Sequence, residues 1–440
     1  RFWGVREPQY WLQFTMPSRL MGTSLTLRLI LAATAVAVAA AAQSQQVFDS
    51  YVVDETSRLE RASNRTSRQY DLDPIHNGPG LHDDFEPLFT RRGRRSVGHR
   101  RCQQLRVKFK EMFRLEVHIF LHVVNRCGFD LRGRTNGSKP TLVAATALYY
   151  LATGSTYSGV TAAMRGGMSV SSVMRHIRTF TKAVTTRLKG LIRFPETESA
   201  FKRCSDCMEK RSGIPGIIGA IDGSHIGVRP PVGERAGFIN YKNQTTIILS
   251  AVVDPRGFFM DISCGYPGKT HDAGALRQSP LWTHHGARFS GLGYAIYGDA
   301  AYPLQPWLLT GFRHRKKSSE QTKFNRQGSR ARVVVECAFG KLKGQWRVLM
   351  KNLESHTTED WNLTISTCCI LHNLTITMGK QGWKFSDSFN GRVPRRDADP
   401  MSFPSDPNPA EFVLGQMRDN SNAKAWRNKI MADLKRGGWI

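Results

Sequence analysis

The stretch Gly219–Ile226 (GAIDGSHI) places a single carboxylate, Asp222, inside a run of apolar and small residues. The longer run Ile217–Val228 is entered from Pro215-Gly216 and has the composition of a β-strand. A carboxylate in a buried strand has to be ion-paired, hydrogen-bonded or bound to metal, because an unpaired buried charge is strongly unfavourable. Asp222, at the end of the apolar stretch, is therefore the first candidate for a functional residue.

The residues that follow continue the β pattern. Thr245–Val253 and Phe258–Tyr266 are rich in β-formers, and the turn Asp254–Gly257 (DPRG) between them predicts a hairpin. A short apolar strand, Tyr294–Tyr297, comes next, and Ser329–Met350 has the apolar spacing of a helix. These elements predict an α/β fold, with a mixed sheet flanked by helices.

Three more acids stand near the ends of these elements. Asp299 follows the short strand, Asp272 follows the hairpin, and Glu336 lies on the predicted helix. Any one of them alone is more often a turn former, a cap or an ion-pair partner, and spacing leaves that alternative open. Converging carboxylates in a basic protein would suit Mg²⁺ or Mn²⁺, which prefer oxygen ligands and can generate a hydroxide nucleophile for phosphodiester cleavage.

The charge balance of the chain indicates an anionic partner. The 440 residues include 63 Lys and Arg against 35 Asp and Glu, a formal net charge of +28. Such an excess favours nucleic acid or another anionic surface, although ribosomal and chromatin proteins share it. Arg91–Arg114 and Arg313–Arg347 are the most basic segments. We expect both to contact DNA phosphates, and the alternative is that they are solvated faces.

Residues 109–191 show helical apolar spacing. A short helix from Thr156, a break at Arg165-Gly166-Gly167 and a helix capped by Ser169 give the outline of a helix-turn-helix. The polar face of the second helix carries Arg175, His176, Arg178 and Lys182. DNA reading and plain helical packing both account for this outline.

The ends of the chain carry weaker signals. An apolar run at 29–42 has the length of a secretory signal, but nothing downstream supports secretion, so we expect a dispensable extension. We divide the chain into a poorly ordered extension (1–100), a helical, helix-turn-helix-like region (101–195), a catalytic domain (215–378) and a C-terminal tail (379–440).

The eight cysteines include a single CxxC, formed by Cys204 and Cys207. We expect reduced thiols, because no second pair stands at zinc-finger spacing. A zinc site that adds His372 to this pair is the weaker alternative.

Several motifs together resemble those of PIF/Harbinger-type DDE transposases. The similar stretches follow one another in the family's order over about residues 110–380. They are GAIDGSHI at 219–226, VVDPRG at 252–257, GYPG at 265–268 with HD at 271–272, GDAAYPL at 298–304, VE at 335–336 with FGKLK at 339–343, and CILHN at 369–373. Ala301 departs from the pattern, because the family usually has Gly there.

The resemblance implies an RNase H-like fold and a divalent-metal-dependent enzyme that cuts and joins DNA at transposon ends. It assigns catalysis to Asp222, Asp299 and Glu336. It assigns metal ligation to these three together with Asp272, and it leaves open whether Asp272 or Asp299 is the middle acid. The alternatives are a domesticated, transposase-derived nuclease and a basic DNA-binding protein without catalysis.

The resemblance and the basic segments together suggest the partners and the setting. The residues expected to contact DNA are Arg313, Arg315, Lys316, Lys317, Arg332, Lys341 and Lys343. The expected partners are terminal repeats in DNA, a separate Myb-like DNA-binding protein and a second copy of the chain, and a membrane is not expected. The expected location is the nucleus, with the run 29–42 as a signal or anchor in the alternative.

Overall fold

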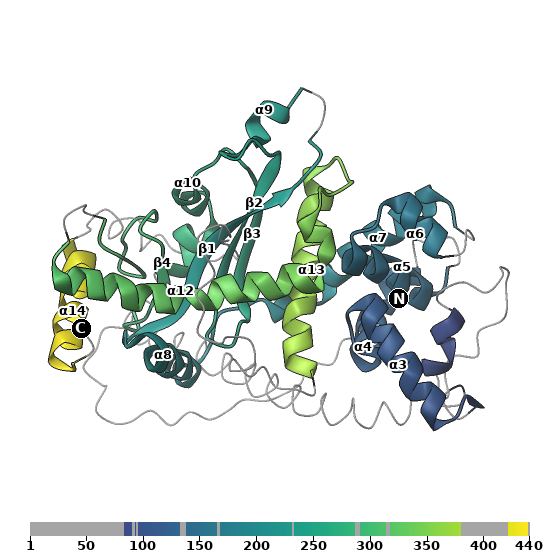
Figure 1. Ribbon diagram of the computed structural model, residues 1–440, viewed down its shortest axis with the longest axis horizontal. Coiled ribbons are helices and arrows are strands. Elements are labelled where there is room, and N and C mark those ends of the chain that lie inside the picture. The colour runs from purple at the N-terminus through teal and green to yellow at the C-terminus, as the bar shows by residue number, and fades with distance from the viewer. Residues whose placement is uncertain are drawn as a thin grey trace, which may run out of the picture. The chain divides into compact units, whose positions relative to one another are not determined.

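The computed structural model describes residues 83–89, 93, 96–132, 138–164, 168–230, 233–286, 291–313, 317–379 and 421–438 (Figure 1). The apolar run 29–42 lies outside these residues, as do Arg315 and Lys316. No helix within the described ranges is both long and apolar enough to cross a membrane.

Helices make up the described chain before the sheet. They are η3 (Asp83–Leu88), α3 (His99–Phe113), α4 (Val117–Arg132), α5 (Pro140–Thr153), α6 (Tyr157–Ala163), α7 (Val170–Arg187), η4 (Lys189–Leu191) and α8 (Glu198–Ser212). Thr156 caps α6, where its side chain accepts a hydrogen bond from Gly159 N. Ser169 caps α7 in the same way, through Ser172 N. Both helices therefore begin where the sequence predicted.

The polar face of α7 is largely committed to contacts within the protein. His176 is buried, with Nδ1 3.4 Å from Thr146 Oγ1. Burial lowers the pKa of His176 to about 4, so this side chain adds no positive charge at neutral pH. Arg178 and Lys182 pair with the carboxylate of Glu359 at 2.8 and 3.7 Å. Helical packing accounts for these three residues, and DNA reading by α7 stays a prediction.

A five-stranded mixed sheet forms the centre of the second half of the chain. Its strands are β1 (Ile217–Gly227), β2 (Thr246–Val253), β3 (Phe259–Pro267), β4 (Ala295–Gly298) and β5 (Leu308–Thr310). The order is β3-β2-β1-β4-β5, antiparallel across β1 to β3 and parallel across β1, β4 and β5. This is the RNase H-like arrangement, so the predicted α/β fold class is confirmed.

Helices cover both faces of the sheet (Figure 1). On one face lie α12 (Ser319–Gln345) and α13 (Thr358–Met378). On the other, Phe201 of α8 and Leu276 of α10 (Asp272–Arg277) join a separate apolar cluster with the sheet. The remaining helical segments are α9 (Arg235–Phe238), η5 (Leu281–His285), η6 (Arg347–Met350) and α14 (Ser421–Arg436).

The long helix α12 begins ten residues before the predicted start. Ser318 and Gln321 form a capping box there, in which each side chain bonds to the other's backbone N–H. The first turns then pass closely over β4, since a Cβ at Gly328 would overlap the hydroxyl of Tyr297. Glycine is therefore required at 328, although it is a weak helix former.

We predict that Gly328→Ala lowers the free energy of unfolding by about 1–3 kcal/mol, because overpacking against the buried Tyr297 ring outweighs the gain in helix propensity. Gly340→Ala is the matched control on the same helix, where a Cβ meets nothing within 4 Å. That variant should gain up to about 1 kcal/mol. Denaturant unfolding of both variants and the parent makes the test. A Gly328→Ala variant as stable as the parent would contradict this packing.

Candidate active site

Three of the four predicted acids come from separate elements that meet beside β1. Asp222 lies on β1, Asp299 follows β4 directly, and Glu336 lies on α12. The parallel pairing of β4 with β1 sets Tyr297 opposite Ala220, so each strand carries its acid two residues further on. Sheet register thus aligns Asp222 with Asp299.

Asp222 stands within β1, not at a strand end as the sequence suggested. The strand continues to Gly227, which pairs with Thr246 of β2. The pairing with β4, in contrast, stops at Ala220. No described strand pairs with this side of β1 between residues 222 and 226, and we call that stretch the open edge of β1. Asp222 is the first residue of the open edge.

One guanidinium group, that of Arg332 on α12, joins the three acids. It forms an ion pair with Asp222, in which Nε lies 3.1 Å from Oδ2 and Nη2 approaches the same oxygen. Nη1 lies 3.4 Å from Asp299 Oδ2, and Nη2 lies 3.3 Å from Glu336 Oε1. Arg332 and Glu336 share one side of α12 because they are four residues apart. Three carboxylates therefore surround a single cation.

The three acids differ in their exposure to solvent. The Asp222 side chain is 2% exposed, whereas those of Asp299 and Glu336 are 41% and 36% exposed. Burial raises the pKa of Asp222 to about 7, although Arg332 and the N–H of Gly223 act to lower it. Burial also opposes the charge on Arg332, but the three acids raise its pKa above the ordinary value. Arg332 stays charged, and the cluster has more acids than cations.

The donor chemistry of the cluster fits a hard divalent cation. Carboxylate oxygens are the ligands that Mg²⁺ takes, and here they already converge on a positive group. As they stand, no three His, Cys, Asp or Glu side chains in the described ranges are arranged to hold a metal ion. That includes Cys204, Cys207 and His372, so the structure does not support the zinc alternative. A metal ion bound by the three acids would compete with the Arg332 guanidinium for their oxygens.

Asp272 occupies a different element from the other three acids. It is the first residue of α10, which packs on β2, and it is partly exposed. The ion pairs of Arg332 join Asp222 to Asp299 and Glu336. Metal ligation by Asp272 stays a prediction.

Lys343, one of the predicted DNA contacts, lies along the open edge of β1. Its Nζ donates to Ser224 Oγ at 2.9 Å and to the His225 carbonyl at 3.4 Å. Arg313 donates to the Tyr302 carbonyl at 2.8 Å. The contacts of Arg332 with the acids were missed from the sequence, which assigned this residue to DNA. Its spacing from Glu336 was the available signal. Lys317 is exposed and Lys341 is partly buried.

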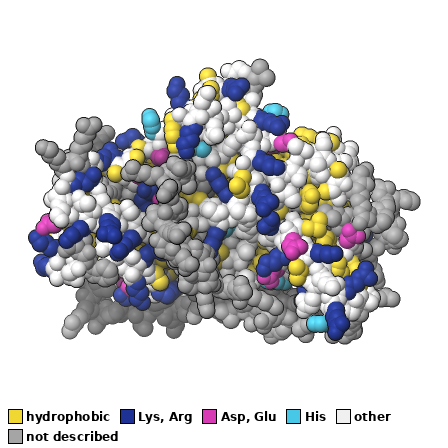
Figure 2. All heavy atoms as spheres, viewed as in Figure 1, with side chains coloured by type: hydrophobic (Ala, Val, Ile, Leu, Met, Phe, Trp, Pro, Cys, Tyr) yellow, Lys and Arg dark blue, Asp and Glu magenta, His cyan; other side chains and the backbone are white. Residues whose placement is uncertain are grey.

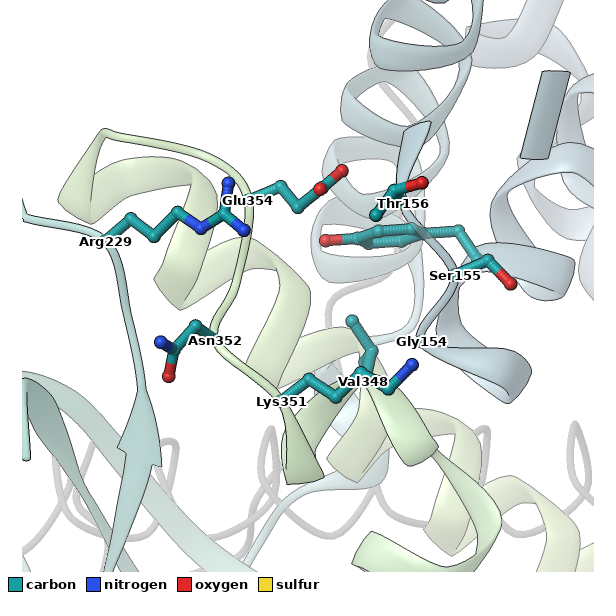
Figure 3. A pocket seen from close by; sticks show the side chains of 9 residues that line it. Gly154, Ser155, Thr156, Arg229, Val348, Lys351, Asn352 and Glu354 are labelled. Carbon is teal, nitrogen blue, oxygen red and sulfur yellow. The ribbon is translucent and has the colours of Figure 1, made fainter. Parts of the chain in front are cut away.

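A separate cavity of about 380 Å³ lies where α5 and α6 meet the chain after α12 (Figure 3). Its lining residues are Tyr150, Gly154, Ser155, Thr156, Arg229, Val348, Lys351, Asn352 and Glu354. Glu354 links α6 to the chain after α12, because its Oε2 accepts a hydrogen bond from Tyr157 N at 2.7 Å. None of the four predicted acids lines the cavity, so it is not the candidate active site.

Comparison with known protein families finds a match over the part of the chain that holds the four predicted acids. Residues 221–373 match the family described as DDE superfamily endonuclease. The chain contains a DDE superfamily endonuclease domain. This domain includes all four predicted acids and the β-strands from β2 to β5.

Relatives of the endonuclease domain occur in animals and plants. Human HARBI1, a candidate nuclease by its name, is 26% identical over 306 residues, which are 68% of this chain and 86% of its own. The protein ALP1-like of Arabidopsis thaliana is 31% identical over 229 residues, 49% of this chain and 56% of its own. Antagonist of Like Heterochromatin Protein 1, also from Arabidopsis thaliana, is 27% identical over 296 residues, 62% and 73% of the two chains. No solved structure matches the chain.

We predict that Arg332→Ala destabilises the metal-free protein by about 1–3 kcal/mol, because Asp222 would stay buried without its hydrogen-bonded partner. Arg326→Ala, at an exposed position of the same helix, is the control and should change stability by less than about 0.5 kcal/mol. Added Mg²⁺ should stabilise Arg332→Ala more than the parent, since no arginine competes for the acids. Thermal unfolding with chelator and with Mg²⁺ measures both effects. Equal losses in the two variants would argue against the counter-ion role.

Proposed function

We propose that this protein is a divalent-metal-dependent DNA endonuclease whose metal ligands are Asp222, Asp299 and Glu336. The observation that carries the proposal is the convergence of these acids on one cation within a DDE superfamily endonuclease domain. HARBI1 supports the same class of activity, because its name describes it as a nuclease. Of the two candidates for the middle acid, the geometry favours Asp299, and Asp272 would serve as an additional ligand.

Each residue has a distinct part in the proposed reaction. Bound Mg²⁺ or Mn²⁺ would supply a hydroxide nucleophile and stabilise charge on the leaving oxygen. Asp222, buried and fixed in the sheet, gives the site its rigid ligand, while Asp299 and Glu336 stand on the solvent side where substrate arrives. With metal on the acids, the Arg332 guanidinium would be available for a phosphate oxygen, which its planar fork suits.

The charge of the surface supports DNA as the substrate. Lys and Arg side chains outnumber Asp and Glu on the face shown in Figure 2. Lys341 and Lys343 follow Glu336 on α12, so positively charged side chains lie further along the same helix. Such groups bind phosphates without reading sequence. We propose the nucleus as the location of the protein, since chromosomal DNA is there. A separate Myb-like protein or a second copy of the chain would supply sequence recognition.

Transposition is the second candidate function. It adds a joining step, in which a 3′-hydroxyl end of cut DNA attacks a target strand at the same metal site. The motif order along residues 219–373 favours it, whereas the name of HARBI1 refers to nuclease activity alone. Incubation of the protein with 3′-hydroxyl oligonucleotides and a target plasmid separates the two, because only a transposase yields joined products.

We predict that Asp222→Asn abolishes DNA cleavage, by at least about a hundredfold, and leaves DNA affinity unchanged or stronger. The amide removes one ligand charge, whereas the phosphate contacts of the basic residues stay. Nicking of a supercoiled plasmid in Mg²⁺ and an electrophoretic binding assay in chelator measure the two properties. Asp206→Asn, at a partly exposed position of α8, is the control and should behave as the parent. Parent-like nicking by Asp222→Asn would refute the assignment.

We predict that metal affinity rises with pH up to about 7 and then levels off. The pKa of Asp222 is raised to about 7 by burial, so below that pH a proton competes with the metal for the carboxylate. The change should approach about tenfold per pH unit on the acid side. Titration with Mn²⁺, with free ion followed by electron paramagnetic resonance, measures it. Asp222→Asn should bind weakly at every pH, and a flat profile for the parent would contradict the linkage.

A further inference from the structure

A highly exposed aromatic side chain lies in the connection between β1 and β2. Tyr241 is 73% exposed, more than any other large hydrophobic side chain that the structure describes. It follows α9, which stands at the outer end of the sheet in Figure 1. A ring exposed to this degree presents apolar surface to solvent, where a flat apolar ligand can stack on it.

The turn that carries this ring, residues 240–244, is held in one shape. Asn240 is buried, and its Oδ1 accepts hydrogen bonds from Lys242 N at 2.9 Å and Gln244 N at 3.0 Å. Asn240 N donates to the Gln244 carbonyl at 2.9 Å, and Asn243 adopts the left-handed backbone conformation, with φ 59°. A side chain presented on a preformed turn loses little conformational entropy when it binds a ligand.

The turn stands at the other end of the open edge of β1 from the acids. The Tyr241 ring lies edge-on to the imidazole of His225, with centroids 6.0 Å apart and planes at 72°. His225 follows Asp222 by three residues, and its carbonyl accepts a hydrogen bond from Lys343. The ring contact with His225 therefore places Tyr241 near the segment of β1 that carries Asp222.

A cation accompanies the exposed ring. Lys242 Nζ lies 5.3 Å from the Tyr241 ring centroid. Residues 242–244, which follow the ring in the same turn, are polar and exposed, so they add none of the apolar area that the core of a protein interface has. An aromatic face beside a lysine is the combination that binds single-stranded nucleic acid, since the base stacks on the ring and the lysine takes a phosphate.

We propose that Tyr241 stacks on an unpaired base close to the cleaved phosphodiester bond, and that Lys242 takes the phosphate beside that base. The inference rests on the proposed function in one respect, the choice of DNA as substrate. It adds the form of that substrate, which is a strand with at least one unpaired base next to the site of cleavage, such as a frayed or overhanging end.

The test uses the full chain without metal, so that binding is measured apart from cleavage. The probes are a blunt duplex and the same duplex with a four-nucleotide 3′ overhang, in which 2-aminopurine replaces each overhang base in turn. The parent should quench 2-aminopurine at one position. Tyr241→Ala should lose that quenching and bind the overhang about tenfold more weakly, with blunt-duplex affinity unchanged.

Three further variants sharpen the result. Tyr241→Phe should keep the quenching, because it retains the aromatic face. Leu292→Ala, another exposed apolar position, should behave as the parent. Lys242→Ala should keep the quenching but lower the salt dependence of binding by about one phosphate contact.

Parent-like quenching and overhang binding by Tyr241→Ala would overturn the inference and assign the turn to a protein partner. Equal loss of blunt and overhang binding would also overturn it, because stacking acts only on unpaired bases. The proposed nuclease activity is judged separately, by plasmid nicking in Mg²⁺. Quenching that depends on Tyr241 in a protein that never nicks DNA would support the stacking and reject the endonuclease.

Discussion

A carboxylate buried in a sheet needs a counter-charge, and the arrangement of the endonuclease domain follows from how Asp222 obtains one. Arg332 can reach it only if α12 crosses β4 closely, and Gly328 allows that approach because it has no side chain to meet Tyr297. The same crossing brings Glu336 to the cluster, since it lies one turn further along α12. One ion pair thus positions the helix, the third acid and the edge of the sheet together.

The ion pair also explains why the three carboxylates stay close together in the absence of metal. Three acids in proximity repel one another, and Arg332 offsets that repulsion while two of the three remain partly exposed. The cation that holds the acids in place is a side chain on a flexible stem. Under the proposed function, a divalent ion with higher charge would take the place of this side chain among the acids.

Local features of the fold could be predicted from the sequence. The turn at Asp254 was predicted, and there Oδ1 accepts hydrogen bonds from Arg256 N and Phe258 N, which closes the hairpin. The strands β1 to β4 were predicted from their apolar and β-branched residues. β5 was missed because three residues carry no pattern. The start of α12 was missed because residues 319–328 are polar apart from Phe324, so the apolar period becomes visible only later.

Contacts between residues far apart in the sequence were harder to predict. Asp222 and Arg332 are 110 residues apart, and no local pattern reports their pairing. The positions of the acids suggested a converging set but left the role of each open, and only the motif resemblance assigned those roles. Which of the acids meet depended on strand order. The exposed position of Tyr241 was equally invisible, because a tyrosine between polar residues has the same local pattern in a buried loop.

The contact between Gly328 and Tyr297 has a consequence for the history of the chain. Neither position can change freely: a larger residue on α12 demands a shorter side chain on β4, and a shorter residue on β4 leaves a void that only a larger one on the helix can fill. Substitutions at the two positions should therefore be correlated among relatives. Such a correlated pair would reveal how α12 lies against β4 in a related protein known only by its sequence.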